Sequence, residues 1–167
     1  MINDLSESLR ALLTQSGLPS GLAAAHISFE RPSEPFNPPQ TTIDLFAYEL
    51  RQNYNVRPPV TSSSGPRQMR IACSYLITAW PVGGSDLALQ EQKLLGEVLQ
   101  VLFAYPVIPA AFLRGTLVGQ DLPHLVMLHP EALGNMSEFW SSLGNKLRPS
   151  LSVTATIAVP AFEAPPS

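Results

Sequence analysis

The side chains able to do reactive chemistry are few in this sequence and stand apart from one another. His124 and His129 are five residues apart, across a segment that we expect to be a strand, which would point them to opposite faces. Two histidines so placed make a poor metal pair without a third ligand, so we expect ordinary surface or core histidines. Cys73 is the one cysteine, and nothing near it in sequence would stabilise a thiolate. We therefore predict that Cys73 is a small buried hydrophobe and that no metal site is present.

Motifs for catalysis and phosphate binding are missing from the sequence. It contains no G-x-S-x-G, no H-E-x-x-H and no C-x-x-C. Gly83-Gly84 lacks the Lys and the Ser or Thr that follow the glycines of a nucleotide loop, so a turn is the better interpretation. A Ser, His and Asp triad assembled from distant positions stays open. We predict no catalytic, cofactor-binding or metal-binding residue, and we interpret Asp44, Glu49, Asp86 and Glu91 as solvent-exposed carboxylates.

Length and charge restrict the class of protein further. The 167 residues suit one domain, and a net charge of −3 without a basic run argues against nucleic-acid binding. No apolar run approaches the roughly 20 residues that span a bilayer, and Asp4 and Glu7 stand where a signal peptide would be positive. Charged residues make up only 14%, against a usual share of about 25%, which favours a surface that contacts copies or partners. We expect no cofactor, no nucleic acid and no membrane insertion.

Residues 67–105 predict the element on which the others would pack: one long strand, a Gly-Gly turn and one long helix. From Met69 to Trp80 the side chains alternate between an apolar face and a mixed face, which is typical of a central strand. Ser85 or Asp86 would supply the N-cap oxygen of the helix, and Pro106 would end it. The helix would pack on the strand through Leu87, Leu94, Leu95, Val98, Leu99 and Leu102.

Three elements and two loops are predicted before that stretch. Residues 1–15 place apolar side chains on one stripe of a helix. A short strand is expected over 25–30 and a long one over 41–50, separated by a stiff loop with four prolines over 31–40. Residues 51–65 predict a long mobile connection that would order only against a neighbouring molecule.

After the long helix the pattern is mixed. Residues 110–113 predict one short helical turn, and residues 124–128 predict a short strand. Asn135 and Glu138 have the spacing of a capping box at the start of a further helix. The apolar face of that helix would consist of Met136, Phe139, Trp140 and Leu143.

The last predicted element is a strand over 150–159 in which apolar and hydroxyl side chains alternate over about 33 Å. Its polar face carries no charge, so the strand could lie at a sheet edge with backbone groups open to another chain. The elements together predict an α+β fold with a central mixed or antiparallel sheet of about four to five strands and helices packed on it. We expect a single domain over residues 1–159 and a short C-terminal tail over 160–167.

Several short segments, spread over nearly the whole chain, carry a family resemblance in their joint order. They are Met1-Ile2-Asn3-Asp4-Leu5 with Leu9 to Leu13; Ile27-Ser28-Phe29-Glu30-Arg31-Pro32; Thr41-Thr42-Ile43-Asp44-Leu45-Phe46-Ala47-Tyr48; Tyr75-Leu76-Ile77-Thr78-Ala79-Trp80 followed by Leu94-Leu95-Gly96; and Trp140, Leu143, Ser150, Leu151 and Ser152. With these segments the chain resembles the cap, or tail terminator, subunits of extracellular contractile injection systems, which are phage-tail-like particles.

The resemblance implies a tail-terminator-like fold and a structural subunit, not an enzyme, in a hexameric ring that ends the inner tube and contractile sheath. The implied partners are further copies of the chain, the inner tube protein and the sheath protein. The implied location is the bacterial cytoplasm during assembly and then the particle. Family members often continue past the closing strand, so this chain, which stops at Ser167, would be a minimal cap.

Two other classes stay open from the sequence. One is an assembly chaperone or adaptor for the tube protein. The other is a small hydrolase, which a concave pocket lined with His and carboxylate would support.

Overall fold

A five-stranded mixed sheet organises the molecule, in the strand order β1-β2-β3-β5-β4. The computed structural model describes residues 1–55, 67–129 and 134–165. The strands are β1 (His26–Ser28), β2 (Thr42–Gln52), β3 (Gln68–Trp80), β4 (His124–Met127) and β5 (Leu151–Pro160). β1 lies parallel to β2, and the other neighbours are antiparallel. The predicted α+β fold and its mixed sheet are confirmed.

β3 lies at the centre of this sheet, as its sequence predicts. Its odd-numbered residues from Cys73 to Ala79 are buried in the main apolar core, and on its other face Leu76 and Trp80 are buried as well. A strand buried on both faces needs cover on both sides. The helices and loops supply that cover unequally, which leaves part of one face open.

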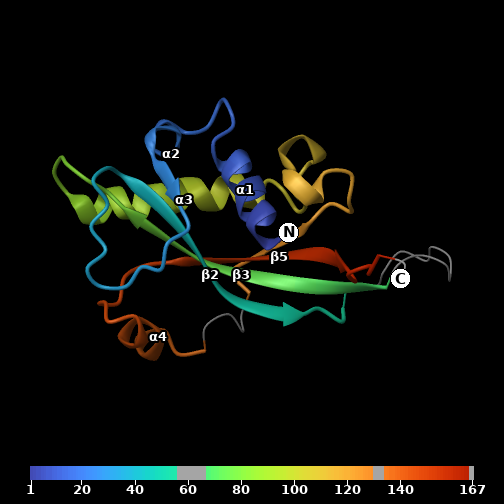
Figure 1. The fold of residues 1–167 in the computed structure, drawn as a ribbon. Helices are drawn as coiled ribbons and strands as arrows, with labels where there is room; N and C mark the ends of the chain where they lie inside the picture. Colours follow the sequence, from blue (N-terminus) through green and yellow to red (C-terminus); the bar gives the residue numbers. More distant parts are fainter. Residues whose placement is uncertain (56–66, 130–133, 166–167) are drawn as a thin grey trace.

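Helices cover the two faces of the sheet differently. α1 (Ile2–Leu13), α2 (Ser20–Ala24) and α3 (Leu87–Phe103) lie on one face, and α4 (Met136–Ser142) lies on the other (Figure 1). The predicted stripe of the first helix, Ile2, Leu5, Leu9, Leu12 and Leu13, is confirmed for its four leucines, which are fully buried in the core, whereas Ile2 is 38% exposed. The short turn η1 (Ala110–Phe112) is also confirmed, whereas α2 and η2 (Gly115–Leu117) are not predicted by the sequence pattern.

α3 packs on β3 through most of its predicted stripe, but its start differs from the prediction. Leu94, Leu95, Val98 and Leu102 are buried in the core. Leu87 is 48% exposed, and the prediction that it belongs to the buried stripe is wrong. The predicted side-chain cap is wrong too, because Asp86 has φ 53 and makes no side-chain cap hydrogen bond. Leu87 lies on the same side of α3 as Leu94 and Val98, so it is exposed because the first turn of the helix extends beyond the residues that would cover it.

α4 and the proline-rich loop behave as predicted. Asn135 Oδ1 accepts a hydrogen bond from the backbone N–H of Glu138 at 3.1 Å, so this helix has its predicted cap. Trp140 is buried on its inner face. Residues 31–40 form neither helix nor strand. The predicted mobile connection over 51–65 lies mostly outside the described residues, although its first two residues extend β2.

β5 lies between β3 and β4, so the prediction that it forms a sheet edge is wrong. β4, only four residues long, pairs with Val153 to Thr156 and closes that side. The hydroxyl side chains of Ser152 and Thr156 are buried, and their lack of charge reflects this burial. β4 is too short for its sequence pattern to indicate that it would pair with β5.

β2 contains one extra residue relative to β3. The register passes from Ala47 opposite Tyr75 to Glu49 opposite Ser74, which is a β-bulge. Because side chains alternate along a strand, one extra residue reverses the face to which every later residue points. Leu50 therefore lies on the helix-covered face, and the charged residues beside it lie on the opposite face.

Candidate assembly surfaces

The two histidines and the cysteine take separate places in the structure. His124 is exposed at the start of β4, which ends at Met127. Leu128 has φ 50, so strand alternation does not extend to His129, and the predicted relation between the two histidines fails. Among the residues that the structure describes, no group of three His, Cys, Asp or Glu could hold a metal ion. Cys73 is confirmed as a buried hydrophobe, and burial raises the pKa of its thiol to about 11.

Asp44 is fully buried, which contradicts the prediction that it reaches solvent. Its Oδ1 accepts hydrogen bonds from Ser28 Oγ at 2.5 Å and from the backbone N–H of Glu30 at 3.0 Å. Its Oδ2 has no hydrogen-bond partner within the described residues. Burial raises the pKa of Asp44 to about 6, although the two hydrogen bonds oppose this. The sequence pattern did not show that β1 and the segment after it return beside this side chain.

Glu91 on α3 is also buried, so its predicted exposure is wrong. Arg148, from the segment before β5, donates from Nε to Glu91 Oε2 at 2.9 Å and also bonds it through Nη2. The guanidinium lies 3.5 Å from the centre of the Trp80 ring, and Phe36 of the proline-rich loop meets the same ring edge-on at 4.5 Å. This cluster joins α3, the end of β3, the proline-rich loop and the entry to β5. The predicted exposure of Asp86 is confirmed.

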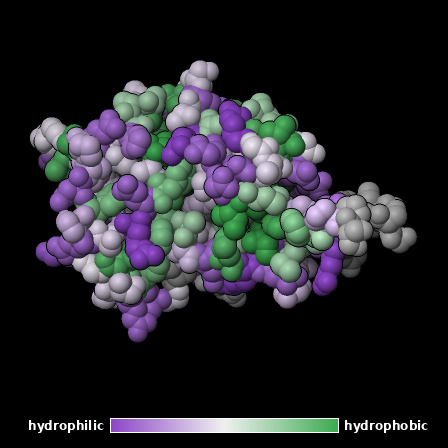
Figure 2. Space-filling view, viewed as in Figure 1, coloured by the Kyte–Doolittle hydropathy of each residue, from purple (hydrophilic) through white to green (hydrophobic). Residues whose placement is uncertain are grey.

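Large apolar side chains are exposed at several places on the surface. Figure 2 shows apolar surface gathered where the first turn of α1 meets the strands. The exposed large apolar residues there are Ile2, Leu50 and Met69, and others stand at the start of α3. Exposed apolar patches mark protein contacts in many soluble proteins.

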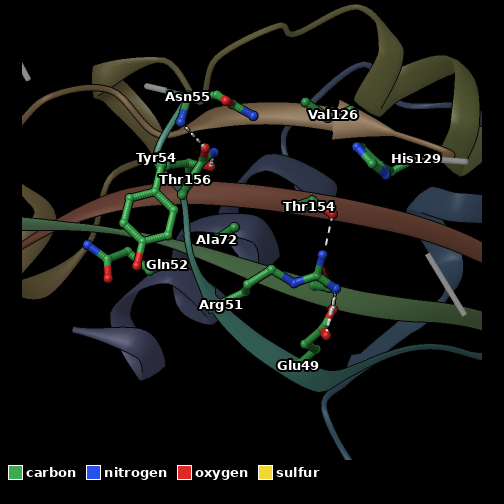
Figure 3. A pocket seen from close by; sticks show the side chains of 12 residues that line it. Glu49, Arg51, Gln52, Tyr54, Asn55, Ala72, Val126, His129, Thr154 and Thr156 are labelled. Carbon is green, nitrogen blue, oxygen red and sulfur yellow. Dashed lines mark hydrogen bonds and ion pairs between the residues drawn. The ribbon is translucent and has the colours of Figure 1, made fainter. Parts of the chain in front are cut away.

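A polar cleft of about 450 Å³ lies on the sheet face opposite α1 and α3 (Figure 3). Most of its lining side chains carry amide, hydroxyl or charged groups. They come from the end of β2 and the residues after it, from β3, from β5, and from β4 and the segment that follows it. The lining residues are Glu49, Arg51, Gln52, Asn53, Tyr54, Asn55, Ala72, Ser74, Val126, His129, Thr154 and Thr156.

Three hydroxyl groups in this cleft, those of Ser74, Thr154 and Thr156, bond to neutral partners. The Ser74 and Thr154 hydroxyls lie 3.1 Å apart and share a hydrogen bond, and Asn53 Nδ2 donates to Thr156 Oγ1 at 3.0 Å. Glu49 forms an ion pair with a neighbouring arginine, with 2.7 Å between nitrogen and oxygen. A nucleophilic hydroxyl needs a base within hydrogen-bond reach, and the partners in these two hydrogen bonds are hydroxyls and an amide. The sequence missed this cleft because its residues come from separate strands.

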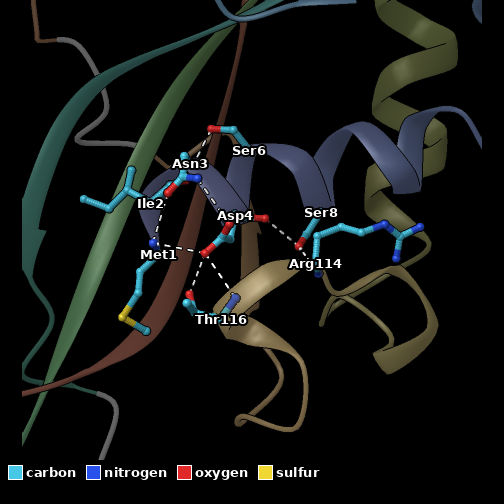
Figure 4. A network of polar contacts seen from close by, with 8 residues as sticks. All are labelled: Met1, Ile2, Asn3, Asp4, Ser6, Ser8, Arg114 and Thr116. Atoms are coloured by element: carbon cyan, nitrogen blue, oxygen red, sulfur yellow. Dashed lines mark hydrogen bonds and ion pairs between the residues drawn. The ribbon is translucent and has the colours of Figure 1, made fainter.

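A network of polar contacts ties the amino terminus to the segment before β4 (Figure 4). Asp4 Oδ2 accepts hydrogen bonds from the Thr116 side chain at 2.5 Å and backbone N–H at 3.2 Å, and pairs with the Met1 amino group at 3.1 Å. The Thr116 bonds lower the pKa of Asp4 below its usual value. Ser8 Oγ accepts from the Arg114 backbone N–H at 3.0 Å. The network holds α1 and the turn η2 together.

Gly115 lies within this network at a φ of 55, where residues with a side chain are strained. A Cβ atom at this position would lie against the carboxylate of Asp4. The close approach of η2 to α1 therefore depends on a glycine here.

No described helix is both long and apolar enough to cross a membrane.

The mixed sheet, with helices across one face, places the chain in the α+β class of tail-terminator-like folds. It shares this fold with the sheath and tube terminator of an extracellular contractile injection system, PVC, at a TM-score of 0.73, and with the tube-terminating cap of the anti-feeding prophage at 0.69. The model of the Pvc16 N-terminal domain family matches residues 4–167, and the chain belongs to this family. The resemblance found in the sequence is thereby confirmed.

The two solved structures differ from this chain in length and sequence. They are 23% and 20% identical to it, and each alignment covers 98% of this chain. The chain spans about 57% of the first and 56% of the second. Both descriptions name terminators or caps, and neither names an enzyme. No curated protein sequence matches the chain significantly.

Proposed function

We propose that the chain is a structural cap subunit that ends the inner tube and the sheath of a contractile injection particle. The observation that carries this proposal is the family match over residues 4–167, together with a terminator fold that covers 98% of the chain. The proposed partners are further copies in a hexameric ring, the inner tube protein and the sheath protein. The chain would assemble in the bacterial cytoplasm and remain in the particle.

The proposed mechanism is geometric and needs no bond-making chemistry. A ring that matches tube and sheath on one side, and offers no equivalent surface on the other, stops further polymerisation. Because the copies in a ring bind together, weak contacts of each subunit add up to stable binding of the ring to the end of the tube and sheath. Exposed apolar side chains such as Leu50 and Met69 supply contact surface of the required kind.

Deletion of the chain from a producing bacterium tests this proposal. We expect particles with tubes of uncontrolled length and sheaths that detach or contract early, both measured by electron microscopy. Labelled chain should restore the normal length and should appear at one end only. Particles of unchanged length and sheath retention, with the chain absent from their ends, would contradict the proposal.

An assembly chaperone for the tube protein is a second candidate class. Mass spectrometry of purified particles separates the two, because a chaperone leaves the finished particle and a cap stays in it. The expected result is a few copies of the chain for each particle.

A small hydrolase is favoured by one observation, since the polar cleft is lined by Glu49 and His129. The ion pair of Glu49 with Arg51 and the neutral partners of the cleft hydroxyls argue against it. Replacement of His129 by Gln and of Glu49 by Gln should leave capping unchanged. Loss of a measured hydrolysis in both variants would support the enzyme instead.

A further inference from the structure

At one end of the molecule, the sheet continues beyond its shorter strands. β1 pairs only with Thr42 to Asp44, and β4 pairs only with Val153 to Thr156, so β2, β3 and β5 extend alone past them. On the helix-covered face of this extension, Leu50 is 54% exposed and Met69 is 46% exposed. Ile2 of α1 is exposed beside these strands (Figure 4).

These residues form one surface that continues the core. Leu50 pairs with Cys73, and Met69 pairs with Val159, which places their side chains on the same face as the core residues of β3. Ile71 and Val159, both half-buried, pack against the core. We call Ile2, Leu50, Met69, Ile71 and Val159 the sheet-end patch.

At the opposite end, the chain turns from β3 into α3 and stands out from the body (Figure 1). Every residue from Val82 to Leu89 is exposed, and this run contains Leu87 at 48% and Leu89 at 62% exposure. Leu87 lies on the same side of α3 as the buried Leu94 and Val98, and it is exposed because the helix begins beyond the body (Figure 1). Leu87 and Leu89 are two positions apart, so they project from nearly opposite sides of this exposed first turn. We call Val82, Leu87 and Leu89, all exposed at this projecting corner, the corner patch.

The two patches lie far apart, because β3 runs between them. Its 13 residues span about 40 Å, from Gln68 near the sheet-end patch to Trp80 before the corner. The patches also have opposite charges beside them. Arg67 precedes β3 at the sheet end, Asp86 lies in the corner, and neither exposed side chain has an ion-pair partner in the part of the chain that the structure describes.

We propose that the sheet-end patch of one copy binds the corner patch of the next copy, head to tail, and that this contact closes the ring. The inference rests on the ring of the proposed function and names its surfaces. A contact of each patch with itself would bring two copies of Arg67, or two copies of Asp86, into one interface, which like-charge repulsion opposes. A head-to-tail contact buries both apolar patches, pairs the opposite charges, and forms a ring if the rotation closes.

Cross-linking of the full chain tests the contact directly. The variant Met69→Cys with Leu89→Cys is treated with a short bismaleimide, both as purified chain and in assembled particles. The native Cys73 is buried, so the unmodified chain serves as the blank. We expect a ladder of covalently joined chains that ends at the ring size. A matched control, Met69→Cys with Phe103→Cys, uses an apolar residue that is 78% exposed and lies outside both patches, and it should give no ladder.

A mixing experiment gives a second measurement. Met69→Glu and Leu89→Glu each spoil one patch at an exposed position, so each variant alone should be a monomer by light scattering. An equal mixture should form dimers and no ring, because one intact pair of patches remains between the two variants. Phe103→Glu should assemble as the unmodified chain does.

The outcomes separate this inference from the proposed function. Chains that cap particles but give no ladder, or give the same products with both cysteine pairs, overturn the inference and leave the cap function intact. Cross-links from Met69→Cys to the tube protein instead of another copy also overturn it. A ladder from purified chain supports the contact even if the chain is absent from particles, in which case only the cap function fails.

Discussion

The buried carboxyl of Asp44 should make the free energy of unfolding depend on pH through this one residue. Its pKa is raised from 3.8 to about 6 by burial, and one of its oxygens has no hydrogen-bond partner among the described residues. That separation corresponds to about 3 kcal/mol of unfolding free energy at neutral pH. Between pH 4 and 6 the folded chain holds a proton that the unfolded chain has lost, so the free energy of unfolding falls as the pH rises. The loss is nearly complete by about pH 7, one unit above the folded-state pKa.

The variant Asp44→Asn removes this pH dependence. Its amide oxygen can still accept the hydrogen bonds from Ser28 and Glu30, while the charge is gone. The amide N–H donors would stand where Oδ2 has no partner, which costs about 1 to 3 kcal/mol at every pH. The difference in free energy of unfolding between the unmodified chain and Asp44→Asn should therefore change with pH, even if the variant is less stable at every pH.

Urea unfolding of both proteins from pH 4 to 8 measures the effect. We expect the stability of the unmodified chain, relative to Asp44→Asn, to fall by about 2.5 kcal/mol over this range, because part of the full effect is already lost at pH 4. Asp86→Asn is the matched control, because this exposed aspartate tolerates Asn at its left-handed φ. Glu30 raises the pKa of Asp44 further through its own charge, so Glu30→Gln should make the fall smaller. A difference between the two proteins that stays constant from pH 4 to 8 would refute the reasoning.

Two further predictions concern stability measured by urea unfolding. Arg148→Ala leaves the buried Glu91 without its partner and should cost about 3 kcal/mol, and a loss below about 0.5 kcal/mol would show that solvent replaces the guanidinium without penalty. Gly115→Ala should cost more than Gly119→Ala. Both glycines have a positive φ, but only at the first would a Cβ atom meet the Asp4 carboxylate, so equal losses would mean that α1 moves aside freely.

The regular elements could be predicted from sequence because their signals are local. Alternation from Met69 to Trp80 identified the central strand, and the leucine stripe identified the helix that packs on it. The cap of α4 followed from two residues, Asn135 and Glu138, three positions apart. In each case, neighbouring residues in the chain hold the information.

The errors arose where distant segments determine the environment. Glu91 is buried because Arg148 reaches it from 57 positions away, and no local pattern records that contact. β5 looked like an edge strand because hydroxyl side chains suit either an edge or a face under polar cover. The cleft could not be predicted at all, since Asn53, His129 and Thr156 are brought together only by the fold. The family, in contrast, could be identified from the order of short segments along the chain. That order does not depend on whether the burial of a single residue is predicted correctly.

The bulge in β2 assigns the two surfaces of the protruding strands. If Tyr48 paired as a regular strand residue, Leu50 would point into the cleft, and Glu49 and Arg51 would lie on the apolar face. Deleting Tyr48 would remove the bulge but leave Glu49 opposite Ser74 and Leu50 opposite Cys73, so both surfaces would keep their residues. One unpaired residue within the strand thus determines whether this end of the sheet offers a neighbouring copy an apolar side chain or two charges.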